Sequence, residues 1–337
     1  MNPARRDPRA LILIGVGVVW LIAQSGFVPG AAASGLGFYW PLLIIGLGVD
    51  LLGWKRPWRV PYTAIAAALV LLGVALFPTP NAVGVPTRFS EPVGAATAAT
   101  VDLALGDAVT NVTSVADSAS LLTADTQGWR HAVFDVAHTN PERIRVSPEA
   151  GGRAPVLTFR PNRWRIGLDT AVPLTLAVDM GSGRADLDLR DVTLSALTVE
   201  GGSGDLKAVL PAAAARYRVG IHGGSGASDV RIAPGAAVDL VLNAGSGRTG
   251  VTFGEFGSAR VTVRSGSGPV VIDVPSEAAV RLLVTSDGSG PLRLGRFLKR
   301  QAGSGETGLW ASGPAAAATP SIDITVERAG SGPITVR

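Results

Sequence analysis

The tripeptide Gly-Ser-Gly recurs through the second half of this 337-residue chain and dominates its organisation. From Gly181 to Gly288 the copies follow one another at intervals of 21 or 22 residues, and another copy follows 42 residues later at Gly330. A fixed period in this range is typical of stacked-repeat proteins, in which each repeat adds one coil to a rod. We interpret the doubled last interval as two periods with one copy degraded.

Each Gly-Ser-Gly is predicted to be a corner between two strands. Glycine adopts positive φ without a Cβ penalty, and its small size lets successive coils approach closely. The segment 201–205 has a weak similarity to calcium-binding nonapeptide repeats, but the period differs and no acidic residue recurs at a fixed offset. The predicted corner glycines are Gly181, Gly183, Gly202, Gly204, Gly224, Gly226, Gly245, Gly247, Gly266, Gly268, Gly288, Gly290, Gly330 and Gly332.

Apolar residues alternate with polar ones on both sides of these corners. Examples are Ala185, Leu187 and Leu189 after one triplet, and Leu240 and Leu242 before another. This period of two predicts half-buried strands, and each repeat is too narrow to bury its apolar face alone. The repeat region 171–337 is therefore predicted to be an all-β solenoid, a stacked β-ladder of about 21-residue coils.

Three apolar stretches precede the repeats, at about residues 10–28, 38–54 and 62–77. Their lengths lie at the short end of what crosses a bilayer core of about 30 Å, so we predict three transmembrane helices within a membrane domain at 1–78. The alternative for the first stretch is a cleaved signal peptide with Ala31–Ala33 as the processing site. The predicted fold class is thus a helical membrane segment joined to an all-β stack.

Basic residues flank these stretches unevenly. By the positive-inside rule, they place the N-terminus and the second loop in the cytoplasm, so the β domain is predicted to be extracytoplasmic and the protein a multi-pass protein of the cell membrane. Residues 79–337, which follow the membrane domain, have no net charge, and this argues against a nucleic-acid partner. The residues that carry this prediction are Arg5, Arg6, Arg9, Lys55, Arg56 and Arg59.

Between the membrane segment and the repeats lie two less regular regions. The proline-rich stretch 79–97 is predicted to be a linker, and 98–170 an N-terminal cap or diverged β repeats. A second irregularity, 297–320, interrupts the repeats and is interpreted as a cover for the open end of the stack, with a partner-binding loop as the alternative.

No catalytic, cofactor or metal site is predicted. The chain has no cysteine, and its three histidines show no spacing typical of a metal site. No strand–helix nucleophile elbow, dinucleotide fingerprint or phosphate loop is present. The acidic residues Asp186, Asp188, Asp229 and Asp273 are expected on an outward, solvated face rather than as a glycosidase pair.

Two regions resemble LiaF-like envelope-stress proteins. Leu11–Gly17, Tyr39–Pro41 and Trp54–Arg56 are similar to the transmembrane region shared by LiaI- and LiaF-type proteins. Trp310 with Pro320–Val326 and Gly330–Val336 resembles the end of their cell-wall-active antibiotic response domain, and the Gly-Ser-Gly strands resemble adhesin-type repeats. The resemblance implies a protein without enzymatic activity, some of whose relatives restrain a two-component sensor kinase that reports cell-wall damage.

We therefore predict a non-enzymatic regulator or scaffold of the cell-envelope stress response. Its expected partners are the lipid bilayer and a membrane sensor kinase or another envelope protein, with self-association possible in principle for such a rod. The alternatives are an adhesin-like module that binds glycans or itself, a polysaccharide-processing enzyme, and a polymerising β-helical cytoskeletal protein.

Overall fold

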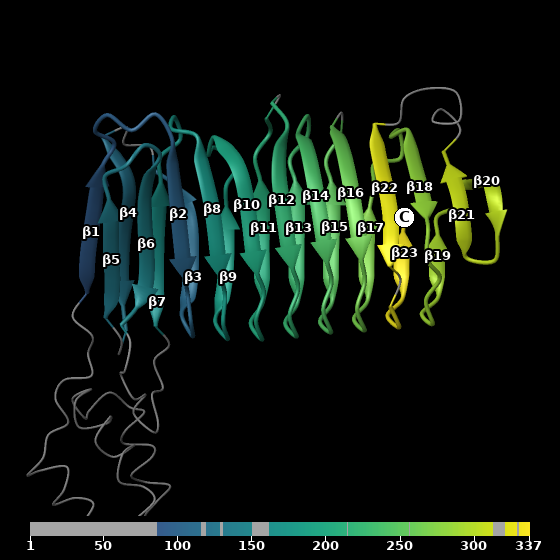
Figure 1. Cartoon of the computed structure of the whole chain (residues 1–337), viewed down its shortest axis with the longest axis horizontal. Coiled ribbons are helices and arrows are strands. Elements are labelled where there is room, and N and C mark those ends of the chain that lie inside the picture. The colour runs from purple at the N-terminus through teal and green to yellow at the C-terminus, as the bar shows by residue number, and fades with distance from the viewer. Residues whose placement is uncertain are drawn as a thin grey trace, which may run out of the picture. The chain divides into compact units, whose positions relative to one another are not determined.

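The computed structural model describes residues 86–115, 119–128, 131–149, 162–213, 215–255, 257–312, 321–328 and 330–337. These residues belong to one compact unit, and every regular element in them is a β-strand (Figure 1). The apolar–polar alternation of the sequence explains this, since it suits a pleated backbone whose successive side chains point to opposite faces. The described strands form two sheets, which we call sheet A and sheet B.

Sheet A contains eleven strands in the described residues. Its spatial order is β1 (Thr87–Pro92), β4 (Ser120–Gln127), β7 (Arg163–Leu168), β3 (Val109–Ser114), β9 (Arg184–Asp188), β11 (Leu206–Leu210), β13 (Ser228–Ile232), β15 (Thr249–Phe253), β17 (Val270–Asp273), β23 (Ile334–Val336) and β19 (Leu292–Leu294).

Sheet B contains twelve strands within the same residues. Its spatial order is β20 (Lys299–Ser304), β21 (Thr307–Ala311), β18 (Val280–Val284), β22 (Ile322–Arg328), β16 (Ser258–Arg264), β14 (Ala237–Asn243), β12 (Tyr217–His222), β10 (Leu194–Glu200), β8 (Leu174–Asp179), β2 (Ala99–Ala104), β6 (Glu142–Pro148) and β5 (Ala132–Ala137).

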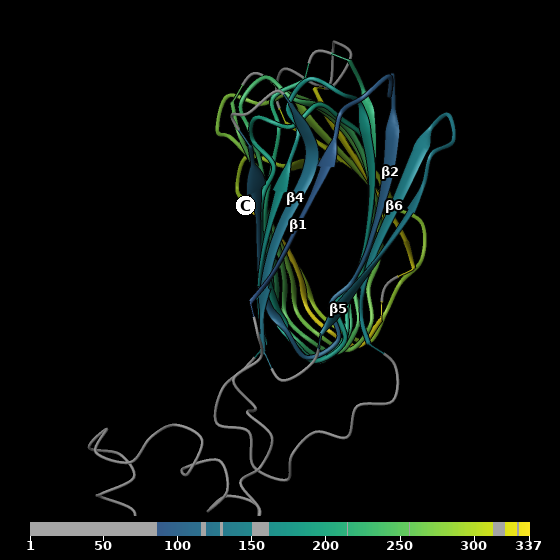
Figure 2. The same ribbon diagram turned by 90° about the vertical axis from the view of Figure 1, so that its left-hand side faces the viewer.

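The two sheets face each other along the whole stack, and their inward side chains form one continuous core (Figure 2). Leu187, Val251 and Ile272 of sheet A are fully buried, as are Leu174, Val238 and Leu282 of sheet B. In the middle of the stack a strand of sheet B leads through a Gly-Ser-Gly corner into a strand of sheet A, and the next coil pairs in parallel with the last. Each coil thus buries its narrow apolar face only because its neighbours are present.

The predicted fold class is wrong as a whole, although its β part is confirmed. In the described residues there is no helix, and none of them provides a helical segment able to cross a bilayer. What the structure supports is an all-β fold of two large sheets over the described residues. The membrane helices were predicted from the hydropathy of the apolar stretches 10–28, 38–54 and 62–77. These stretches lie outside the described residues.

Strand β1 lies inside the stretch that was predicted to be a linker. The prediction weighed the prolines as breakers, yet Pro86 precedes the strand and Pro92 ends it. β1 occupies the edge of sheet A, where a missing backbone N–H is tolerated. Its antiparallel register with β4 pairs Thr87 with Thr126 and Glu91 with Leu122.

Strands β2 to β7 lie in the same two sheets as the repeats, but not in chain order. β2 and β3 pair in parallel with β8 and β9, whereas β6 and β7, which follow them in sequence, lie on the outer side of β2 and β3. Antiparallel β4 and β5 then flank β7 and β6.

The interpretation of the 42-residue interval as a degraded copy is wrong. The residues after Gly288 form β19 and then the hairpin β20–β21, which pairs antiparallel with β18. The chain then returns, and β22 and β23 occupy the place between β16–β17 and β18–β19 (Figure 1). The interval is long because a hairpin and a return connection fill it, and the last triplet belongs to a coil laid down out of order.

Candidate functional site

The Gly-Ser-Gly corners form a column of stacked backbone. A Cβ added at Gly202 would lie 1.6 Å from the carbonyl oxygen of Gly181, and one at Gly204 would lie 1.5 Å from that of Gly183. The amide of Ser203 donates to the Gly181 carbonyl at 2.8 Å, which fixes this close approach. Among the described corner glycines, only Gly181 has a positive φ, so close coil-to-coil contact, rather than backbone conformation, accounts for most of these glycines.

The predicted outward carboxylates lie on the outer faces of their strands, and three of them, Asp188, Asp229 and Asp273, lie beside arginines. Arg190 Nε donates to Asp188 Oδ1 at 2.8 Å, and this hydrogen bond lowers the pKa of Asp188 below its usual value. Arg337 Nε likewise donates to Asp273 Oδ1 at 2.6 Å. Asp188, Asp229 and Asp273 thus each form an ion pair with one arginine. The topology residues Arg5 to Arg9 and Lys55 to Arg59 lie outside the described residues.

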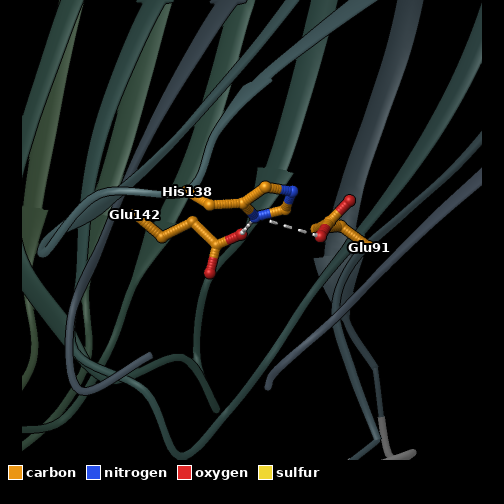
Figure 3. A group of neighbouring side chains, drawn as sticks. All are labelled: Glu91, His138 and Glu142. Carbon is orange, nitrogen blue, oxygen red and sulfur yellow. Dashed lines mark hydrogen bonds and ion pairs between the residues drawn. The ribbon is translucent and has the colours of Figure 1, made fainter. Parts of the chain in front are cut away.

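Glu91, His138 and Glu142, which were not predicted to form a site, come together at the end of the stack that begins with β1 (Figure 3). Glu91 is contributed by β1 of sheet A, and Glu142 is the first residue of β6 in sheet B. His138 lies in the turn between β5 and β6. The ligand atoms of the three residues all lie within 4.8 Å of one another.

His138 Nδ1 occupies the centre of this cluster. It lies 3.1 Å from Glu142 Oε1 and 3.9 Å from Glu91 Oε1. The side chains of Glu91 and Glu142 are only 12% and 9% exposed, whereas the His138 side chain is 73% exposed. The cluster therefore has a solvent side formed by the imidazole and a buried side formed by two carboxylates.

The neighbourhood holds the three residues in place. Phe89, two residues before Glu91 on the same face of β1, stacks on Phe134 of β5 with ring centroids 4.5 Å apart. The Glu142 amide donates to the Ala98 carbonyl at 3.1 Å, and Thr139 Oγ1 donates to the Pro141 carbonyl at 2.8 Å. An aromatic pair and a braced turn thus fix the approach of sheet A to sheet B at this end.

The sequence contained one signal that points to this cluster. His138 and Glu142 are four residues apart around Asn140-Pro141, and this turn brings both side chains to the same place. Glu91 could not be found from local pattern, because it is remote in sequence and fell in the predicted linker. The other histidines do not join the cluster: His222 pairs with Glu200 at 2.7 Å on the outer face of sheet B.

The outer face of sheet B carries a second feature, a register row without charged residues. We call it the neutral row, and it crosses seven neighbouring strands from β8 to β18. Parallel register aligns its residues side by side. Val241 and Leu283 within it are unusually exposed for apolar side chains, at 37% and 38%. The row comprises Ala177, Thr198, Gly220, Val241, Thr262, Thr325 and Leu283.

On five of these strands, from β12 to β18, a row of alternating charge runs beside the neutral row, two residues earlier on each strand. Its pairs include Arg281 with Asp323, whose bidentate contact raises the pKa of the guanidinium. The charges compensate one another along the sheet, and like charges do not meet. The row consists of Arg218, Asp239, Arg260, Asp323 and Arg281.

Comparison with known proteins finds a family match for the N-terminal part of the β stack, which includes the Glu91–His138–Glu142 cluster. Residues 87–233 match the family profile described as the N-terminal domain of toast_rack, DUF2154. No curated protein matches the chain.

Two solved structures are similar in part. One is described as a "putative cell adhesion protein" from Clostridium sporogenes, with 14% identity, a TM-score of 0.38, and coverage of 75% of this chain and 100% of the other. The second is described as a "putative adhesin" from Bacteroides fragilis, with 12% identity, a TM-score of 0.37, and coverage of 75% and 96%.

Proposed function

We propose that this protein is a non-enzymatic surface module that binds another envelope protein along the outer face of sheet B. The neutral row carries this proposal. Its side chains are uncharged, so removing water from them on contact with a partner costs little free energy. The alternating charges beside it would orient that partner, because complementary charges favour one docking register and penalise others.

A finer part of the proposal concerns the pathway. We propose that the partner belongs to a cell-envelope stress response and is a membrane sensor kinase or a protein acting with one. The match of residues 87–233 to the toast_rack N-terminal profile supports this, together with the LiaF-like resemblance of both ends of the sequence. On this proposal the protein is held at the cell membrane with its β stack outside the cytoplasm.

A genetic experiment tests the proposal. Deletion of the gene is expected to change expression of a cell-wall stress reporter under cell-wall antibiotics, and the wild-type chain should restore it. A Val241→Lys/Leu283→Lys chain should fail to restore it, because two charges interrupt the neutral row. Thr252→Lys, an exposed change on the outer face of sheet A, is the matched control and should restore it fully.

Thermal unfolding of the purified variants separates loss of binding from loss of folding. If the double variant and the control have equal unfolding midpoints, a failure of the double variant to restore expression reflects lost binding and not lost folding. A reporter that responds identically with and without the gene would overturn the stress-response part. Full complementation by the double variant would overturn the assignment of the binding face.

An adhesin-like function is a second candidate, favoured by a different feature. A groove of about 430 Å³ lies on the outer face of sheet A near β1, with Arg88, Asp125 and Arg165 among its lining residues. These side chains offer the mixture of donors and acceptors that suits a saccharide. Glycan-array binding by the full chain that is lost on Arg165→Ala would favour this function over the first.

A further inference from the structure

We propose that Glu91, His138 and Glu142 bind a divalent cation of the Zn²⁺ type, which ties sheet A to sheet B at the end of the stack that begins with β1. The three side chains offer one imidazole nitrogen and two carboxylate oxygens. This donor set suits Zn²⁺ or Mn²⁺ better than Ca²⁺ or Mg²⁺, which take oxygen ligands and seldom imidazole.

The distances between the ligand atoms fit such an ion. In a tetrahedral Zn²⁺ site, two ligand atoms at about 2.0–2.1 Å from the metal lie about 3.3 Å from each other. The His138 Nδ1 contacts of 3.1 Å to Glu142 and 3.9 Å to Glu91 bracket that value. The largest separation in the cluster, 4.8 Å, requires only a small movement of a glutamate side chain. Three protein ligands leave a fourth position open to water.

Burial and charge give an independent reason to expect a cation. The Glu91 side chain is only 12% exposed and points at the cluster, yet among the described residues its carboxylate makes no hydrogen bond and has His138, 3.9 Å away, as its only ion-pair partner. Two mostly buried carboxyl groups face one imidazole, so acidic groups outnumber basic ones in the cluster. A divalent cation would balance that charge and supply the missing partner for Glu91.

The position of the ligands explains what the ion would do. Glu91 lies on the edge strand of sheet A, while His138 and Glu142 belong to the outer hairpin of sheet B. Within the described residues, the Phe89–Phe134 stack is the aromatic contact that joins the same strands. A metal beside this stack would act as a clasp between two edge strands, and the exposed face of His138 gives the ion a path from solvent.

Metal binding to the untagged full-length chain tests the proposal. After treatment with EDTA, equilibrium dialysis against micromolar Zn²⁺ should recover about one ion per chain. Affinity should fall roughly tenfold or more in His138→Gln and in Glu91→Gln, since each loses one of three ligands. Zn²⁺ should raise the thermal unfolding midpoint of the wild-type chain and leave that of His138→Gln unchanged. Mg²⁺ and Ca²⁺ at the same concentration should do neither.

His222→Gln is the matched control, because His222 also contacts a glutamate, Glu200, but among the described residues it belongs to no group of three possible ligands. It should bind Zn²⁺ as the wild-type chain does. His138 is largely exposed, so His138→Gln is expected to fold even if Glu91→Gln does not. Absence of Zn²⁺ binding at micromolar concentration, or wild-type binding by His138→Gln, would overturn the proposal and leave the cluster as an ion pair.

Discussion

From β8 to β15, each strand pairs in parallel with the strand two places further along the chain, whereas at both ends the pairing is out of chain order or antiparallel. A parallel stack has no natural end, because each new coil exposes the same row of backbone donors and acceptors as the coil before it. At the end that begins with β1, both sheets finish with strands antiparallel to their neighbours, β4 and β1 in sheet A and β5 in sheet B. At the far end, sheet B finishes with the antiparallel strands β21 and β20, whereas β19 of sheet A is parallel to β23.

The difference teaches that the middle and the ends are stabilised by different contacts. In the middle, glycine corners and fully buried aliphatic side chains repeat from coil to coil. At the ends, the stabilising contacts do not repeat from coil to coil. Examples are the Phe89–Phe134 stack and the contact of Arg300 with the Trp310 ring at 4.8 Å. Substitutions should therefore be severe in the middle and mild at the ends.

The largest effect is expected at the glycine column. Gly204→Ala places a methyl group against the backbone of the adjacent coil and should destabilise the fold by at least about 4 kcal/mol, or prevent folding. Gly305→Ala in the β20–β21 turn meets no atom within 4 Å and has only its positive φ to strain, so it should cost about 1 kcal/mol. Denaturant unfolding of both variants measures the comparison, and equal losses would refute it.

The next effect tests whether β22 behaves as a middle strand despite its late place in the sequence. Ile324→Ala removes a fully buried side chain between β16 and β18 and should cost about 3 kcal/mol. Leu294→Ala on the edge strand β19 removes a half-buried side chain and should cost less than about 2 kcal/mol. Urea unfolding gives both values. A smaller loss for Ile324→Ala than for Leu294→Ala would show that β22 does not occupy this position.

A third prediction concerns a buried hydroxyl in the middle. Tyr217 Oη donates to the Pro211 carbonyl at 2.9 Å, so Tyr217→Phe should cost about 1–2 kcal/mol. Burial raises the pKa of Tyr217 above its ordinary value, so the folded state holds this proton after the unfolded chain has lost it. Stability should therefore fall as pH rises above about 10.

Urea unfolding from pH 8 to 11 checks this dependence on pH. The decline above pH 10 should be shallower in Tyr217→Phe than in the wild-type chain. A decline of the same slope in both chains would assign it to other groups.

The smallest effect is expected at the far end. Arg300 lies over the ring of Trp310 and also donates to the carbonyls of Gly303 and Gly305, so it links both strands of the exposed hairpin. Arg300→Leu should cost about 0.5–1 kcal/mol, measurable as a small fall in the unfolding midpoint. Lys299→Leu, its exposed neighbour, is the control and should leave the midpoint unchanged. A loss above that of Tyr217→Phe would contradict the view that the ends are weakly coupled to the stack.

The middle coils were accessible from the sequence because their information is local. A fixed period locates the corners, and alternation of residues such as Leu187 and Ile272 identifies the inward face. The same reasoning found a strand at Ile322–Val326 but not its neighbours. Nothing in an alternating pattern records which strand lies beside it, so the out-of-order pairing of β22 was not predictable.

The Glu91–His138–Glu142 cluster escaped prediction for the same reason. Glu91 is 47 residues from His138, and it becomes a neighbour only because β1 pairs with β4 at the edge of sheet A. The neutral row likewise depends on register between strands about 21 residues apart, which the period suggests but only the pairing establishes. Single-chain patterns thus predict faces, while sites built across strands require the topology.

The late coil β22–β23 has a consequence for how the protein folds. Strands β18 and β19 are synthesised before β22 and β23, yet in the finished molecule they rest against them and not against β16 and β17. Two folding routes are therefore open to the chain. Either β18 and β19 leave a gap one coil wide next to β16 and β17, or they pair with β16 and β17 first and separate again before β22 and β23 insert. In either route the last coil inserts between two coils made earlier. A molecule that bound in this position first would hold the protein in a state that lacks the β22–β23 coil.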